Sequence, residues 1–158
     1  MITAVDTNAL LAILYEDSHT DASEEALRRA YQAGKIVIIP VVYAELAADG
    51  HFDSDNKLSK FLTDFSIQLV EPSRSALFRA GQQFQRYTKR RPNGLQCSAC
   101  GNKQTVVCEE CKEQMTSRQH IAADFIIGGH AVVDADALIS FDSGFYASYF
   151  PSLSVEPD

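Results

Sequence analysis

Four acidic residues occupy positions where a parallel α/β sheet would bind a ligand. Two of them directly follow apolar runs, a third lies within two helical turns of another run, and the fourth interrupts an apolar stretch. They are Asp6, Asp142, Glu45 and Asp124, in that order. Because such sheets bind ligands beyond the carboxyl ends of their strands, we expect the four carboxylates to converge in one cleft.

Converging carboxylates repel one another, and burying an isolated one costs several kcal/mol. The usual compensation is a hard divalent cation with oxygen ligands, and such ions activate water for phosphodiester hydrolysis. We therefore predict a Mg²⁺ or Mn²⁺ site with Asp6, Asp124 and Asp142 as ligands, directly or through water. Glu45 would hold the metal or its water. The short polar neighbours would orient carboxylates or contact a phosphate; they are Thr7, Asn8 and Ser140.

Each acid also has an ordinary structural interpretation. Asp6 and Asp142 could cap helices, Glu45 could lie on a solvated helix face, and Asp124 could cap a helix or form an ion pair. Their joint placement near strand ends favours the metal site. His120, which precedes Asp124 by four residues, is interpreted as a surface residue or as a neighbour of the site.

Four cysteines form two CxxC pairs, Cys97/Cys100 and Cys108/Cys111, separated by seven residues. Two tight turns that each supply two thiolates can bind a metal tetrahedrally, so this spacing predicts a structural Zn²⁺ site. A rubredoxin-like iron site is the alternative. Since the segment has few apolar residues, two redox pairs or structural thiols would not explain how it becomes ordered.

Apolar runs and helical periods alternate along the chain, which predicts an α/β fold. We expect strands at 2–5, 36–39, 67–70, 137–141 and 153–155, and helices at 9–15, 20–33, 41–48, 57–65, 73–90, 119–133 and 143–149. Continuous apolar strands are typical of a mostly parallel sheet covered on both faces, hence a three-layer α/β/α sandwich. The predicted domain comprises residues 1–91 and 116–158, and residues 92–115 form an inserted zinc-ribbon-like knuckle.

The net charge of −7 argues against a general nucleic-acid binder. Residues 86–118, however, carry seven basic and three acidic side chains, a charge of +4, whereas the rest of the chain carries −11. A phosphate-bearing partner would approach from this basic side, although residues 86–91 could equally be a solvated helix end. The predicted nucleic-acid-binding residues are Arg86, Lys89, Arg90, Arg91 and Arg118.

Four segments resemble the motifs of PIN-domain ribonucleases: Val5–Leu11, Pro40–Leu46, Ala123–Ala131 and Leu138–Phe145. The third has Gly128-Gly129 where Ala-Ala is usual, which lowers helix propensity by up to about 1 kcal/mol per glycine. The resemblance implies a parallel α/β/α fold, Mg²⁺- or Mn²⁺-dependent cleavage of RNA, and frequent homodimers. Many similar small proteins are VapC-type toxins blocked by an antitoxin protein. Some PIN endonucleases of ribosomal-RNA processing carry a zinc ribbon after the domain.

We therefore expect a metal-dependent endoribonuclease whose substrate is RNA, as a toxin of a toxin–antitoxin pair or a related enzyme. Two alternatives are a non-cleaving RNA- or protein-binding module and a Mg²⁺-dependent phosphohydrolase of small phosphoesters. The sequence contains no Gly-rich phosphate loop, which disfavours the latter. No apolar run approaches the roughly 20 residues of a membrane span, and no signal peptide is evident, so we expect a cytoplasmic protein.

Overall fold

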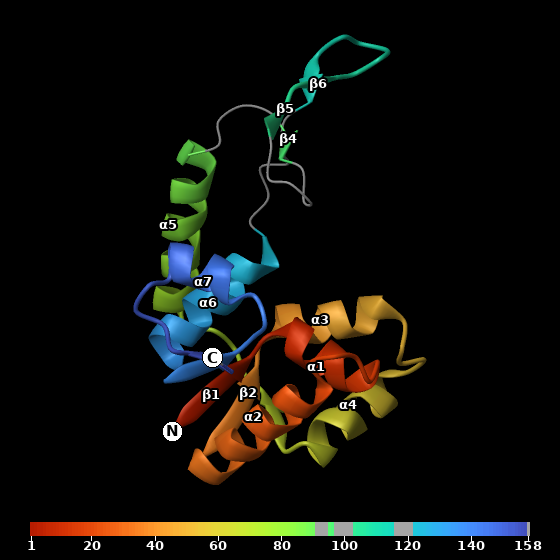
Figure 1. The fold of residues 1–158 in the computed structure, drawn as a ribbon, viewed down its shortest axis with the longest axis vertical. Coiled ribbons are helices and arrows are strands. Elements are labelled where there is room, and N and C mark those ends of the chain that lie inside the picture. The colour runs from red at the N-terminus through yellow and green to blue at the C-terminus, as the bar shows by residue number, and fades with distance from the viewer. Residues whose placement is uncertain (91–94, 97–102, 116–121, 158) are drawn as a thin grey trace.

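A five-stranded sheet forms the centre of the fold (Figure 1). The computed structural model describes residues 1–90, 95–96, 103–115 and 122–157. The strands of the sheet are β1 (Ile2–Val5), β2 (Lys35–Ile38), β3 (Ile67–Leu69), β8 (Ala137–Ile139) and β9 (Val155–Glu156). Their order is β3-β2-β1-β8-β9, and all four pairings are parallel. The prediction of an α/β fold with a mostly parallel sheet is confirmed.

Strand β1 lies in the middle of the sheet and is buried on both faces. Its residue Ala4 pairs with Val37 of β2 on one side and with Leu138 of β8 on the other. All three side chains are at most 3% exposed. Asp6, which follows β1, therefore lies at the end of the central strand of the sheet.

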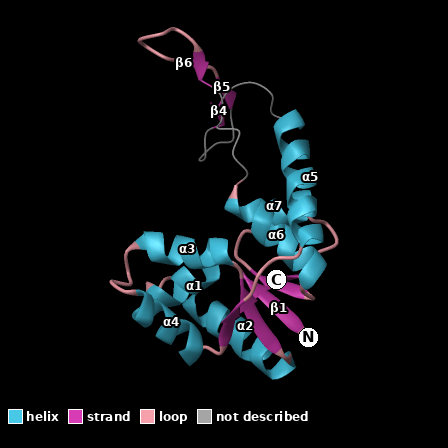
Figure 2. Ribbon diagram, turned by 180° about the vertical axis from the view of Figure 1, so that it is seen from behind, coloured by secondary structure: helices cyan, strands magenta, loops and turns pink. Residues whose placement is uncertain are grey.

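Seven helices surround the sheet within the described part of the chain. They are α1 (Thr7–Leu14), α2 (Thr20–Ala33), α3 (Pro40–Asp49), α4 (Asp55–Asp64), α5 (Arg74–Arg90), α6 (Ala123–Asp134) and α7 (Ser143–Tyr149). Helix α2 packs on one face of the sheet beside α1, and α6 packs on the other face beside α5 (Figures 1 and 2). No helix of the described residues is long and apolar enough to cross a membrane.

The main difference from the predicted elements concerns the helix that carries Asp124. We expected it to begin near Gln119, but Ala122 is extended, with φ −74° and ψ 149°, and the helix begins at Ala123. Residues 116–121, including His120, lie outside the described residues. Asp124 consequently lies in the first helical turn, where the unpaired N–H groups and the helix dipole favour a negative charge.

Two short hairpins lie within the predicted insert. Strands β4 (Leu95–Gln96) and β5 (Lys103–Gln104) pair antiparallel, as do β6 (Val106–Val107) and β7 (Gln114–Met115). Figure 1 draws these strands beyond the end of α5, apart from the central sheet. The zinc knuckle itself stays a prediction.

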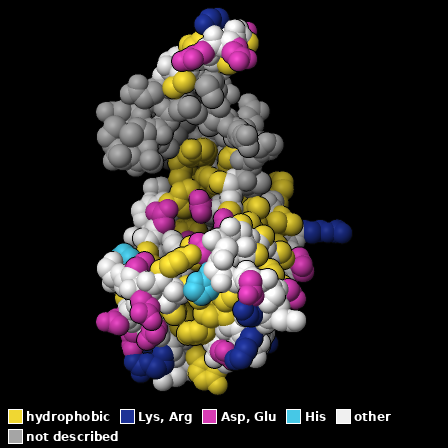
Figure 3. Space-filling model, turned by 90° about the vertical axis from the view of Figure 1, so that its right-hand side faces the viewer, with side chains coloured by type: hydrophobic (Ala, Val, Ile, Leu, Met, Phe, Trp, Pro, Cys, Tyr) yellow, Lys and Arg dark blue, Asp and Glu magenta, His cyan; other side chains and the backbone are white. Residues whose placement is uncertain are grey.

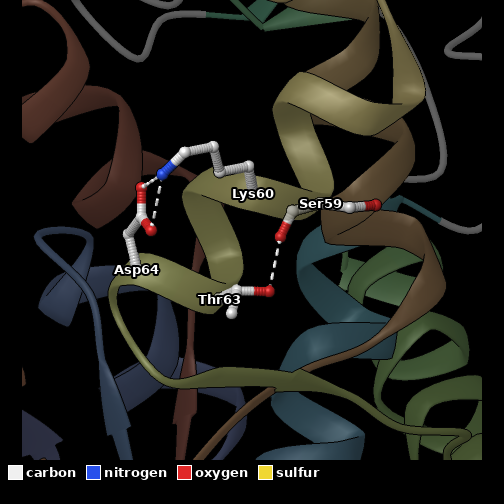
Figure 4. Close-up of polar contacts among 4 residues, drawn as sticks. All are labelled: Ser59, Lys60, Thr63 and Asp64. Atoms are coloured by element: carbon white, nitrogen blue, oxygen red, sulfur yellow. Dashed lines mark hydrogen bonds and ion pairs between the residues drawn. The ribbon is translucent and has the colours of Figure 1, made fainter.

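The outer surface of α4 has the polar contacts expected of a solvated helix. Lys60 contacts both carboxylate oxygens of Asp64, one turn further on, and the Thr63 hydroxyl donates to the backbone oxygen of Ser59 (Figure 4). Exposed pairs of this kind contribute at most about 0.5 kcal/mol. These contacts therefore add little to the stability of the fold.

The two glycines of α6 lie where this helix approaches its neighbours closely. A Cβ atom on Gly129 would be 2.6 Å from the carbonyl oxygen of Ala76 and 2.9 Å from Cβ of Ala80, both on α5. A Cβ atom on Gly128 would meet the ring of Phe150. Because Gly129 has no side chain, α5 can cross α6 closely, and Gly128 leaves room for the ring of Phe150.

We predict that Gly129→Ala destabilises the protein by about 1–3 kcal/mol, because the added methyl group overlaps backbone that cannot move without shifting α5. Gly81, on α5, is the matched control, since a Cβ atom there would meet nothing within 4 Å. Gly81→Ala should stabilise the protein by up to about 1 kcal/mol through helix propensity. Urea unfolding of both variants measures the difference; equal effects would contradict the packing argument.

Candidate active site

Asp6 is the buried centre of the site. It follows β1, is 4% exposed, and its backbone N–H donates to the carbonyl oxygen of Ile139 at 2.9 Å. It is also the N-cap of α1, because its Oδ1 accepts the backbone N–H of Thr7 at 2.7 Å. Burial raises the pKa of Asp6 above its usual value, against the opposing effect of its hydrogen bonds.

The second oxygen of Asp6 receives three donors, two of them from distant parts of the chain. Oδ2 accepts the Ser140 hydroxyl at 2.7 Å, the Tyr146 hydroxyl at 3.1 Å and the Asn8 side-chain amide at 3.1 Å. Asn8 also donates to the Ser140 hydroxyl and accepts the backbone N–H of Phe141, both at 3.1 Å. This network joins the carboxyl ends of β1 and β8 around one carboxylate.

Glu45 reaches the same region from α3. Its carboxylate accepts the hydroxyl of Thr7, so the residue after Asp6 holds the second acid in place. Asp49, one turn further along α3, accepts the hydroxyl of Tyr15. Helix α3 begins at Pro40, shortly after β2, so its first turns lie beyond the carboxyl end of that strand.

Asp124 approaches from the first turn of α6. Its pKa is raised to about 6, chiefly because the carboxyl is desolvated, and further by the nearby charges of Asp6, Glu45 and Asp142. The other three acids are therefore close enough to Asp124 to disfavour its ionisation.

Asp6, Glu45 and Asp124 line one cavity of about 450 Å³. It is lined by Asp6, Thr7, Asn8, Leu11, Glu45, Ala48, Asp49 and Asp124; we call it the acidic pocket. Figure 3 shows acidic side chains interspersed with hydrophobic ones on the side where α1 and α3 lie. Two other cavities, of about 470 and 520 Å³, each include an arginine beside at most two acids, so neither combines four carboxylates as this one does.

Asp142 lies at the margin and is not among the residues that line the cavity. Its side chain accepts the backbone N–H of Phe145 at 3.3 Å and caps α7. Its charge nevertheless raises the pKa of Asp124 and Asp6. The structure therefore places three of the four predicted acids in the pocket and the fourth beside it, on a helix cap.

Two residues of the site were absent from the sequence prediction. Asp49 lies four residues after Glu45 on α3, and this helical spacing was a signal that could have revealed it. Tyr146 carried no signal in the sequence, because its partner Asp6 is 140 residues away.

The residues of the acidic pocket fit a hard divalent cation by their chemistry, because they offer carboxylate and amide oxygens whose charges repel one another. Among the described residues, however, no three His, Cys, Asp or Glu side chains are gathered closely enough to hold a metal ion. Mg²⁺ commonly keeps several waters and uses only one or two protein carboxylates. The pocket therefore suits an ion bound partly through water.

The structure describes one of the two CxxC pairs, Cys108 and Cys111, which lie in a turn. The backbone N–H groups of Cys111 and Glu110 point at the sulfur of Cys108 and lower the pKa of this thiol. The turn is closed by two hydrogen bonds, from Cys108 N to Glu113 O at 2.9 Å and from Lys112 N to Cys108 O at 3.0 Å. Cys108 and Cys111 form no disulfide. Cys97 and Cys100 lie outside the described residues.

The predicted basic surface is described only at α5. Arg86 and Lys89 are exposed there, and each side chain contacts a neighbouring glutamine, Gln83 and Gln85 respectively, at 3.4 Å. The side chain of Arg90, together with Arg91 and Arg118, lies outside the described part of the chain.

A parallel α/β fold with an acidic pocket at the carboxyl ends of its strands defines the class of this protein. The family model of the PIN domain matches residues 3–99, and the chain belongs to this family. The match includes Asp6 and Glu45 but ends before Asp124 and Asp142. No curated protein shows significant sequence similarity to the chain.

Solved structures with the same fold include chains of three VapBC structures. VapBC2 from Rickettsia felis, bound to a DNA fragment from its promoter, gives a TM-score of 0.61 at 16% identity and covers 99% of this chain and 98% of that chain. VapBC-1 from nontypeable Haemophilus influenzae gives 0.56, and DNA-bound VapBC from Salmonella typhimurium gives 0.55, each at 13% identity with coverage of 99% and 97%. At these identities the similarity concerns the fold.

The raised pKa of Asp124 makes the stability of the metal-free protein depend on pH. Because the folded protein holds this proton more tightly than the unfolded chain, the favourable contribution is complete below about pH 4. It is lost as the pH rises through about 6. Asp124→Asn should therefore stabilise the metal-free protein at pH 8 by on the order of 1 kcal/mol, since partial exposure screens the effect.

Urea unfolding in EDTA at pH 4.5 and 8 measures this difference. The variant and the wild type should differ little at pH 4.5 and diverge at pH 8. A constant difference between the two pH values would show that Asp124 does not titrate in this range.

Proposed function

We propose that this protein is a Mg²⁺- or Mn²⁺-dependent endoribonuclease of the PIN family. The observation that carries the proposal is the acidic pocket, which Asp6, Glu45 and Asp124 line together at the ends of parallel strands. Desolvation, and then the charges of the neighbouring acids, raise the pKa of Asp124 there. Membership of a family typical of nucleases supports the same chemistry.

The contacts of each side chain in the pocket suggest its role. Asp6 and Asp124 would hold the cation, directly or through its waters, and Asp142 would add negative charge from the margin. Glu45, held by Thr7, would accept a hydrogen bond from a metal-bound water. When bound, the cation would activate water and neutralise charge on the phosphodiester. Asn8 and Ser140 would keep Asp6 oriented through their hydrogen bonds to its Oδ2.

We predict that Asp6→Asn abolishes Mg²⁺-dependent cleavage of RNA, lowering the rate at least about a thousandfold, since it removes the charge at the centre of the site. The fold should persist because the amide keeps the shape and removes a desolvated charge. Asp64→Asn, on the exposed surface of α4, is the matched control and should cleave like wild type. Cleavage measured with and without EDTA tests both variants; activity in EDTA would exclude metal-assisted hydrolysis.

We further propose that residues 92–115 bind a structural Zn²⁺ ion through Cys97, Cys100, Cys108 and Cys111. The support is the CxxC spacing together with the Cys108 turn, whose backbone N–H groups point at the sulfur and favour a thiolate. This knuckle and the exposed Arg86 and Lys89 of α5 would steer RNA towards the acidic pocket.

Replacing Cys108 and Cys111 with serine should remove one zinc ion per chain, as measured by metal analysis. RNA binding should weaken and become less salt-dependent, whereas single-turnover cleavage of saturating RNA should change far less. Thr105→Ala, on the same exposed segment, should leave zinc content and RNA binding unchanged. Zinc loss with unaltered affinity and salt dependence would assign the knuckle to folding or protein docking instead.

We also propose a protein antitoxin as a partner. The support is the shared fold with chains of three VapBC structures. A short reading frame beside this gene, whose product relieves growth arrest caused by the chain, would establish the partnership. Growth that is unaffected by expression of the active enzyme would argue against a toxin.

A further inference from the structure

We propose that Tyr146 is a positioning residue of the acidic pocket: its hydroxyl fixes one oxygen of Asp6 and leaves the other available to a divalent cation. The inference rests on the proposed function, because it assumes that the pocket binds Mg²⁺ or Mn²⁺. It adds a residue that belongs to none of the motifs in the sequence and states which carboxylate oxygen is available to the ion.

The two oxygens of Asp6 differ in how many donors they accept. Oδ2 receives the hydroxyl of Ser140 at 2.7 Å, the hydroxyl of Tyr146 at 3.1 Å and the amide of Asn8 at 3.1 Å. A carboxylate oxygen offers about two lone pairs, so three donors make Oδ2 much less available to a cation than Oδ1. Among the described residues Oδ1 receives one donor, the backbone N–H of Thr7 at 2.7 Å, and keeps one lone pair.

The position of Tyr146 indicates that its hydroxyl has a role beyond packing. The residue is fully buried, and its ring packs against Phe145 and Phe150 at centroid distances of 5.1 and 6.3 Å. A phenylalanine ring would fill this space equally well and would bury no polar group. The buried hydroxyl is instead compensated by its hydrogen bond to Oδ2 of Asp6 at 3.1 Å.

Asp142 contributes to this arrangement through the backbone. Its side chain caps α7 by accepting the N–H of Phe145 at 3.3 Å, and Tyr146 is the next residue of that helix. Asp142 thus caps the helix that carries Tyr146, and Tyr146 in turn donates a hydrogen bond to Asp6. Neighbours that orient a metal ligand typically change metal affinity 10- to 100-fold when they are removed.

The experiment compares Tyr146→Phe with Tyr149→Phe in the full chain. Tyr149 lies on the same helix, is also buried and belongs to the same aromatic cluster, but donates to no carboxylate of the pocket in the described structure. Calorimetric titration with Mn²⁺ measures affinity, and urea unfolding in EDTA measures the stability of the same samples.

We expect Tyr146→Phe to weaken Mn²⁺ binding about tenfold or more, and Tyr149→Phe to leave it unchanged. RNA cleavage by Tyr146→Phe should need a correspondingly higher Mn²⁺ concentration and recover at saturation. A Tyr146→Phe variant that is less stable but binds Mn²⁺ like wild type would overturn the inference, because the hydroxyl would then serve folding alone.

A second measurement keeps the hydroxyl in place. With 3-fluorotyrosine at position 146 of the otherwise unchanged chain, the ¹⁹F resonance should shift on addition of Mg²⁺, with the dissociation constant found by calorimetry. A resonance that does not respond to bound Mg²⁺ would overturn the inference. Wild-type protein that binds neither Mg²⁺ nor Mn²⁺ would overturn the proposed function as well, whereas normal wild-type binding with an unaffected variant would overturn only the role of Tyr146.

Discussion

A single desolvated carboxylate sets the constraints for the rest of the site. Asp6 follows the central strand of the sheet and is almost completely buried, so its charge must be met by donors drawn from other segments. Ser140 comes from the end of β8, Tyr146 from α7, and Thr7 and Asn8 from the start of α1. Each of these elements must be in its native place before the charge is compensated, which couples the assembly of the fold to the assembly of the site.

The other acids of the site are less buried than Asp6. Asp124 lies in the first turn of α6, where desolvation, and then the charges of Asp6, Glu45 and Asp142, raise its pKa. Helix α6 can reach this position because two glycines allow α5 and the ring of Phe150 to approach its backbone. The close packing of α6 thus places Asp124 near the other acids. A bound cation would reduce the repulsion among these carboxylates.

The basic insert and the acidic pocket divide the proposed task between two charged regions. The pocket by itself would repel a polyanion, whereas the segment from Arg86 to Arg118 carries a charge of +4. In the proposed enzyme, long-range attraction comes from the insert and the end of α5, and chemistry comes from the carboxylates with their cation. This separation is how a protein with a net charge of −7 could act on RNA.

The sequence by itself determined the features that depend on short-range patterns. Continuous apolar runs indicated the strands of a parallel sheet, and the acids that follow such runs, including Asp6, pointed to the edge where ligands bind. Proline and glycine indicated some helix ends, such as Gly34 after α2 and Pro40 at the start of α3. The start of α6 was not indicated, because Ala122, which has good helix propensity, adopts an extended conformation before Asp124.

Only the tertiary structure decided how these groups are used. It showed that Gly129 lies against the backbone of Ala76, that Asp142 caps α7 beside the pocket, and that Tyr146 donates to a carboxylate 140 residues away. Spacing along the chain cannot reveal such relations. Desolvation, close backbone approach and the saturation of an oxygen by donors depend on which elements meet in space, and that is settled only when the whole core is packed.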